Sequence, residues 1–163
     1  ARVNLGQTQL PGAAVAAGIG DEAFAQALGM QLFDARGSLR RAFEPEAENI
    51  VNSASRARKL LDELKNPRLR IVMDLANLVS PGCNQKDVLD ESFALIGNAI
   101  GIAHAKDRNK EFKACAPGKG ILDFEYYLRS LKQSGFAGPL IMHGFEEEDV
   151  AFARDFLHRS LAL

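Results

Sequence analysis

The chain has 163 residues, of which 47% are hydrophobic and 25% are charged, and its formal net charge is −1. This composition is typical of an ordinary globular domain. Such a balanced charge provides no basic field for nucleic acid or for an anionic membrane. No apolar run approaches the roughly 20 residues that cross a bilayer. We therefore expect neither nucleic acid nor a membrane as a partner.

The two cysteines, Cys83 and Cys115, lie in polar, loop-like stretches and form no C-x-x-C metal motif. No signal peptide precedes them, which favours a reduced, cytoplasmic setting. The sequence starts at Ala1 rather than at a methionine, a first indication that upstream residues are missing.

The N-terminal segment, residues 1–38, is poorly defined by its pattern. Residues 1–20 are rich in Gly, Ala and Gln and have no clear period, so we expect a loop. Residues 21–33 can form one helix, which Gly29 weakens. We assign the remaining residues, 39–163, to a separate and much better patterned region.

From residue 39 onward, short apolar segments alternate with amphipathic stretches of helical period. The apolar positions of the first such helix are Ile50, Val51, Ala54, Ala57, Leu60, Leu61 and Leu64. Asp123 is placed to cap a later helix. The expected strands cover residues 39–43, 69–73, 100–103 and 140–142, and the expected helices cover residues 50–64, 86–98, 124–131 and a segment from 147 onward.

This alternation predicts an α/β fold with about four parallel strands. Four strand-helix units are half of an eight-unit barrel, which takes about 250 residues. An open, doubly wound sheet of four strands has the same local pattern. No GxGxxG or P-loop follows any strand, which argues against a nucleotide-binding version.

All four expected strands end on a residue that can bind a metal. These residues are Glu44, Asp74, His104 and His143, at intervals of 30, 30 and 39 residues. The carboxyl ends of parallel strands meet at one edge, where α/β folds place their chemistry. Two carboxylates and two imidazoles suit a divalent cation such as Mn²⁺, Co²⁺ or Zn²⁺.

Simpler interpretations exist for each residue. Glu44 can begin a helix, Asp74 can cap one or form a salt bridge, and His104 can be a core histidine. Lys106 and Arg108 can hold a substrate phosphate or carboxylate, or lie in a solvated loop. For Gly118-Lys119-Gly120, a tight turn is a safer prediction than a phosphate clamp.

The segments that carry a family resemblance are FEPEAENIV, IVMDLANL, AHAKDR and APGKGILDFEYYLRSLKQSGFAGPLIMHGF. They resemble the sugar phosphate isomerase/epimerase family, whose fold is the xylose isomerase-like TIM barrel, over residues 43–157. The resemblance implies a divalent metal (Mn, Co, Mg or Zn) held by Glu, Asp, His and a fourth ligand, usually Glu. It also implies interconversion of sugars or related hydroxyketones through an enediolate.

Carried over by position, the metal ligands are Glu44, Asp74, His104 and His143. His143 stands where many members have their last glutamate, so epimerisation by two glutamates is not expected here. Asn77 replaces a histidine that is often found at its position, and Lys106 belongs to a lysine-aspartate pair that is common in the family. The resemblance thus implies the catalytic residues Glu44, Lys106 and His143 and the substrate-binding residues Asn77, Lys106 and Arg108.

The leading hypothesis is therefore an enzyme: a metal-dependent isomerase or epimerase of a sugar or sugar phosphate. One alternative is an AP-endonuclease-like hydrolase or lyase, which requires more histidines and a basic surface. Another is a truncated, non-catalytic remnant, because residues 1–42 do not resemble the first half of a barrel. Half a barrel would leave two open edges, the strands before Glu44 and His143, and a homodimer is the simplest way to cover them.

Overall fold

The computed structural model describes residues 15–17, 30–33 and 39–162. Its main feature is a six-stranded sheet in the order β1-β8-β5-β4-β3-β2. Neighbouring strands are parallel except for β2 and β3, which are antiparallel. The strands are β1 (Val15–Ala17), β2 (Met30–Phe33), β3 (Leu39–Phe43), β4 (Leu69–Asp74), β5 (Ile100–Ala105) and β8 (Leu140–Met142).

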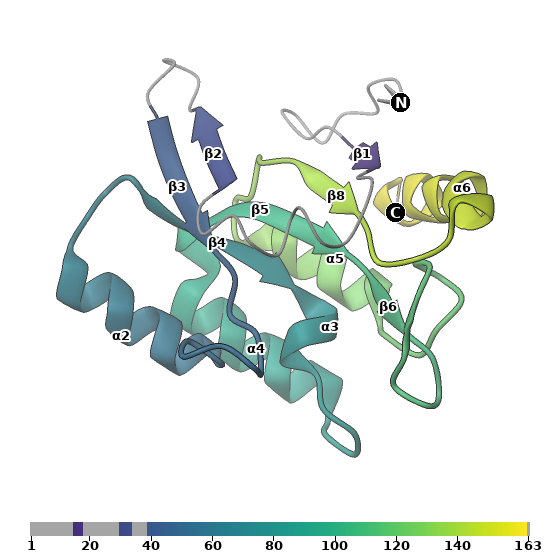
Figure 1. Cartoon of the computed structure of the whole chain (residues 1–163), viewed down its shortest axis with the longest axis horizontal. Helices are drawn as coiled ribbons and strands as arrows, with labels where there is room; N and C mark the ends of the chain where they lie inside the picture. The colour runs from purple at the N-terminus through teal and green to yellow at the C-terminus, as the bar shows by residue number, and fades with distance from the viewer. Residues whose placement is uncertain (1–14, 18–29, 34–38, 163) are drawn as a thin grey trace.

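Helices follow the parallel strands, and Figure 1 shows α2, α4 and α5 along the same side of the sheet. The longer helices are α2 (Ala54–Leu64), α4 (Gln85–Ile96), α5 (Phe124–Gln133) and α6 (Val150–Leu161). A short helix, α3 (Leu75–Leu78), directly follows β4, and 3₁₀ turns cover Gly97–Ala99 and Glu147–Asp149. Strands β6 (Asp107–Arg108) and β7 (Ala114–Cys115) form a separate small ribbon.

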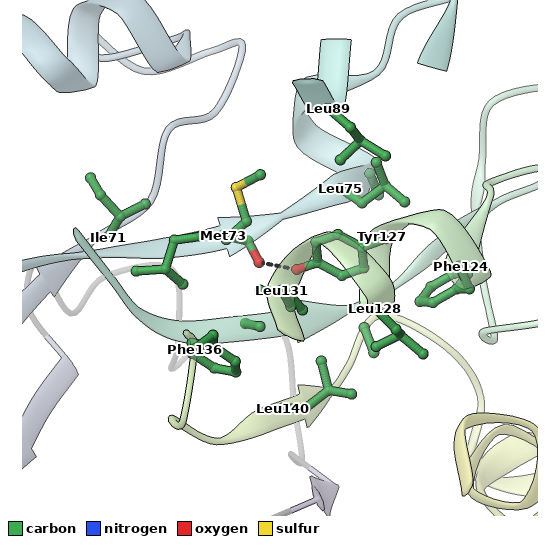
Figure 2. Close-up of a cluster of buried hydrophobic side chains, with 14 of the residues drawn as sticks. Ile71, Met73, Leu75, Leu89, Phe124, Tyr127, Leu128, Leu131, Phe136 and Leu140 are labelled. Atoms are coloured by element: carbon green, nitrogen blue, oxygen red, sulfur yellow. Dashed lines mark hydrogen bonds between the residues drawn. The ribbon is translucent and has the colours of Figure 1, made fainter. Parts of the chain in front are cut away.

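The core follows from the two-residue period of the strands. Ile71 and Met73 of β4 belong to the large cluster that the helices cover, whereas Val72 between them packs with Ala42 and Ile102 in a second, smaller cluster. Tyr127 of α5 reaches across the large cluster and donates its hydroxyl hydrogen to the carbonyl of Met73 at 2.8 Å (Figure 2). The helical layer is thereby attached to the strand that ends on Asp74.

The predicted α/β fold with four parallel strand-helix units is confirmed for residues 39–162. Asp123 caps α5 by accepting from the Tyr126 N–H at 2.9 Å, as predicted. The first helix begins later than predicted: Ser53 caps it, and Ile50 is 89% exposed ahead of it.

The N-terminal prediction needs two corrections. Met30–Phe33, expected as the end of a helix, is strand β2, because pairing with β3 overrides a weak helical period; residues 18–29 lie outside the described residues. The strands before Glu44 and His143 are also not the edges of the sheet, since β2 flanks β3 and β1 flanks β8. The homodimer stays a prediction. The strands that it would cover are β1 and β2, which are the outer strands of the sheet.

Within the described residues, no helix has the length and apolar character needed to cross a membrane.

Candidate metal centre

The fold brings the four predicted strand-end residues to one edge of the sheet. Asp74 ends β4 and lies in register with His104 of β5, while Glu44 and His143 directly follow β3 and β8. Because the strand order is β8-β5-β4-β3, Asp74 and His104 are central, and Glu44 and His143 flank them.

The two oxygens of Asp74 have different partners. Oδ1 accepts the Ala76 N–H at 2.9 Å and so caps α3, which was the simpler interpretation of this residue. Oδ2 lies 2.9 Å from Lys106 Nζ, 3.2 Å from His143 Nε2 and 3.8 Å from His104 Nδ1. Burial raises the pKa of Asp74, but contacts with the two histidines and the Lys106 charge outweigh it and hold the pKa well below its usual range.

His104 is buried, and neither of its ring nitrogens has a hydrogen-bond partner. Its Nδ1 lies 3.4 Å from Glu44 Oε1, and its ring contacts that of His143 edge to face, with centroids 4.3 Å apart. Burial lowers the pKa of His104, but the carboxylates of Asp74 and Glu44 favour the protonated ring and raise it to about 9. The interpretation as a core histidine bonded to backbone does not fit this arrangement.

The donor set fits a divalent cation. One ligand atom from each of Asp74, His104 and His143 can be chosen so that all lie within 4.8 Å of one another. Buried polar atoms normally have a hydrogen-bond partner, and neither nitrogen of His104 has one, although carboxylates of Glu44 and Asp74 lie 3.4 Å and 3.8 Å from Nδ1. A nitrogen of this ring is therefore suited to binding a ligand. Two imidazoles and a carboxylate are ligands that Zn²⁺, Co²⁺ and Mn²⁺ accept. Glu44 adjoins this group through its contact with His104.

Asn77 links Glu44 to the cationic side chains of the site. Its Nδ2 donates to Glu44 Oε1 at 2.7 Å, and its Oδ1 accepts from Lys106 Nζ at 3.0 Å. Arg108 Nη2 approaches the same oxygen at 3.5 Å, and Arg108 Nε donates to the Ala76 carbonyl at 3.1 Å. Arg108 is therefore part of the site's framework, and the solvated-loop interpretation is wrong for it.

Two residues, Tyr127 and the Asp107 of the lysine-aspartate pair, support the site through contacts that the sequence did not predict. Tyr127 falls within the expected helix 124–131, where its pattern indicates only an apolar position, yet its hydroxyl donates to the Met73 carbonyl and lies 3.3 Å from the His104 carbonyl. Asp107 is buried and accepts the N–H groups of Gly118 and Gly120. Those N–H groups are therefore not available to a phosphate, and Lys119 pairs with Asp149. In the sequence, the only indication of this loop was the pair Gly118 and Gly120 on either side of Lys119.

A model of the xylose isomerase-like TIM barrel matches residues 8–159. The chain belongs to this family. Among curated members, L-ribulose-5-phosphate 3-epimerase UlaE of Escherichia coli is 33% identical over 120 residues, which are 69% of this chain and 41% of that protein. The chain thus spans less than half the length of this xylose isomerase-like relative.

Solved structures support the same fold. A xylose isomerase domain protein from Alicyclobacillus acidocaldarius matches with a TM-score of 0.60 at 17% identity, over 76% of this chain and 50% of that one. D-allulose 3-epimerase from Methylomonas sp., solved in complex with D-allulose, matches with a TM-score of 0.54 at 20% identity, over 79% of this chain and 46% of that one. The chain corresponds to about half of a barrel in each case.

Proposed function

We propose that this chain carries the metal site of an isomerase or epimerase that acts on a sugar or sugar phosphate. The observation that supports this proposal is that ligand atoms of Asp74, His104 and His143 lie within 4.8 Å of one another, and that no hydrogen bond occupies the buried ring nitrogens of His104. Membership of the family and the relationship to a ribulose-phosphate epimerase support a sugar or sugar phosphate as the substrate class. Asp74, His104 and His143, with Glu44 beside them, would hold a divalent cation.

The bound cation would supply Lewis-acid stabilisation of the negative charge that develops on the sugar's oxygens. Glu44 is the base: its carboxylate removes the proton from the carbon next to the carbonyl, and the electron pair moves to the carbonyl oxygen to give an enediolate. Asn77 holds Glu44 by its bond to Oε1 at 2.7 Å, which fixes the direction of that transfer. Lys106 brings a positive charge to the same site.

His143 is the second proton-moving group of the proposal, in the steps in which its imidazole would not be bound to the cation. Glu44 and His143 follow β3 and β8, on either side of the two central strands, so a substrate above Asp74 and His104 would lie between them. An imidazole can donate or accept a proton near neutral pH. Return of the proton to the neighbouring carbon gives isomerisation, and return to the opposite face of the same carbon gives epimerisation.

Deuterium exchange tests the reaction even while the identity of the sugar is open. The chain, loaded in turn with Mn²⁺, Co²⁺, Mg²⁺ or Zn²⁺, is incubated in D₂O with free and phosphorylated ketopentoses and ketohexoses. We expect metal-dependent incorporation of deuterium next to the carbonyl, detected by NMR, because any enediolate route exchanges that proton with solvent. Absence of exchange with every metal and every sugar would overturn the proposal.

A further inference from the structure

Asp107 is a second buried carboxylate, outside the donor set of the metal centre. Its side chain is 1% exposed and accepts four backbone N–H groups. Oδ1 accepts from Arg108 at 2.7 Å and from Leu122 at 3.1 Å, while Oδ2 accepts from Gly118 at 3.1 Å and from Gly120 at 3.0 Å. Converging backbone N–H groups form a nest that suits an anion. The anion in this nest is the carboxylate of Asp107.

The loop is built to close on this carboxylate. A Cβ at Gly120 would lie 2.2 Å from Asp107 Oδ1 and 2.3 Å from the Arg108 carbonyl oxygen, so a side chain there would force the nest apart. The Ile121 N–H donates to the same Arg108 carbonyl at 2.8 Å. The loop from 118 to 122 is therefore tied to the backbone of β6 as well as to the Asp107 side chain.

The residues on either side of Asp107 face the candidate site. Side chains alternate between the two faces of an extended segment, so Lys106 and Arg108 point away from the nest. Lys106 Nζ reaches Asn77 Oδ1 at 3.0 Å, and Arg108 Nε reaches the Ala76 carbonyl at 3.1 Å. Anchoring the backbone between these two cations limits the directions that both of their side chains can take.

We propose that Asp107 is a positioning residue of the site: it fills the nest of the loop from 118 to 122 and thereby directs Lys106 and Arg108 toward Asn77 and Ala76. The inference rests on the proposed function only in treating Lys106 and Arg108 as part of an active site. The competing explanation is that Asp107 merely stabilises its loop. The two explanations differ in what happens to the Arg108 side chain when the nest is weakened.

Asp107→Asn is the test variant, because it keeps the shape of the side chain but presents an NH₂ group to one pair of N–H donors. Hydrogen exchange is followed by NMR at two places: the amides of Gly118, Gly120 and Leu122, and the Nε–H of Arg108. We expect exchange to accelerate about tenfold at both places, as losing about 1.4 kcal/mol of protection would give. Faster exchange in the loop with an unchanged Arg108 Nε–H overturns the proposal, as does no change at either place.

Gly120→Ala gives an independent approach if the first variant does not fold, because it disturbs the nest while keeping the carboxylate. The matched controls are Gly97→Ala, where the nearest atom to a new Cβ is 3.4 Å away, and Asp87→Asn, at an exposed aspartate of α4. Neither control should alter the exchange of Arg108 Nε–H. All of these readouts are independent of turnover, so loss of the deuterium-exchange activity and failure of this inference are distinguishable.

Discussion

Asp74 and Asp107 are both 1% exposed, yet their surroundings differ in kind. Both carboxylate oxygens of Asp107 accept hydrogen bonds from backbone N–H groups. These hydrogen bonds can break only if the backbone of the loop moves. Asp74 has one oxygen on a backbone N–H, and its other oxygen faces the side chains of Lys106, His104 and His143. Burial alone therefore does not distinguish a carboxylate that can bind a ligand from one that holds a loop in place. The nature of the partners does, because side chains can rotate away to admit a ligand.

The largest effect is expected at the base of the proposed reaction. Glu44→Gln removes the carboxylate that takes the proton, and should lower the deuterium-exchange rate by about 10²–10⁴-fold. Glu147→Gln, at an exposed position of the 3₁₀ turn before α6, should change the rate less than about twofold. Equal, small losses in both variants would show that Glu44 is not the base.

Replacing each of the two aspartates by asparagine, in separate variants, tests the comparison directly. Asp74→Asn should weaken Mn²⁺ or Co²⁺ binding by about 100-fold or more, since ligand and outer-shell changes act at this scale. Asp107→Asn should leave metal affinity near its original value but lower Tm by about 5 °C, because buried N–H groups lose their acceptor. Titration calorimetry and thermal melts measure both quantities. The comparison would be wrong if Asp107→Asn weakened metal binding by about 100-fold and Asp74→Asn left it unchanged.

The pH dependence of the metal-free chain should reveal His104. Its pKa rises from 6.5 to about 9 on folding, so its protonation contributes stability that is fully present below pH 6.5 and is lost as the pH rises through about 9. The urea midpoint should fall across this window, and His104→Gln should flatten the change. Because a metal binds the neutral ring, metal binding near pH 7 should also release protons, which calorimetry in buffers of different ionisation enthalpy detects.

The smallest effect is expected beneath the site. Tyr127→Phe removes one hydroxyl that donates to the Met73 carbonyl, and it keeps the ring in the core. We expect a loss of about 1 kcal/mol in the free energy of unfolding, or about 3 °C in Tm, and little change in metal affinity. A large loss of metal binding would mean that Tyr127 controls the spacing of Asp74 and His104.

The parallel strand-helix units and the meeting of Asp74, His104 and His143 could be predicted from the sequence. Each strand is a short apolar run, and the βα repeat places all of its carboxyl ends at one edge. The helix α3 could not be predicted, because its four residues are too few to show a period. The β2–β3 pairing also escaped prediction, because it depends on partners from another segment and not on local propensity.

The surroundings of the site were harder to predict than its central residues. Asn77 was expected to bind substrate, but in the structure its amide oxygen faces Lys106 and its NH₂ group faces Glu44. That orientation depends on three segments, after β3, in α3 and after β5, that meet only on folding. The nest around Asp107 is similar, since its donors lie up to 15 residues away in sequence. The types and spacing of residues identified which side chains could bind a ligand. Their hydrogen-bond partners could be identified only from the structure.

The cap that Asp74 places on α3 has a consequence for observing the site. One carboxylate joins the proposed cation position to the Ala76 N–H, so a charge drawn to Oδ2 withdraws electron density from Oδ1 as well. The Ala76 amide is thus an internal reporter, whose proton resonance should shift as the site fills. Occupancy can be read from a single backbone signal, without a coloured metal, a substrate or a turnover assay.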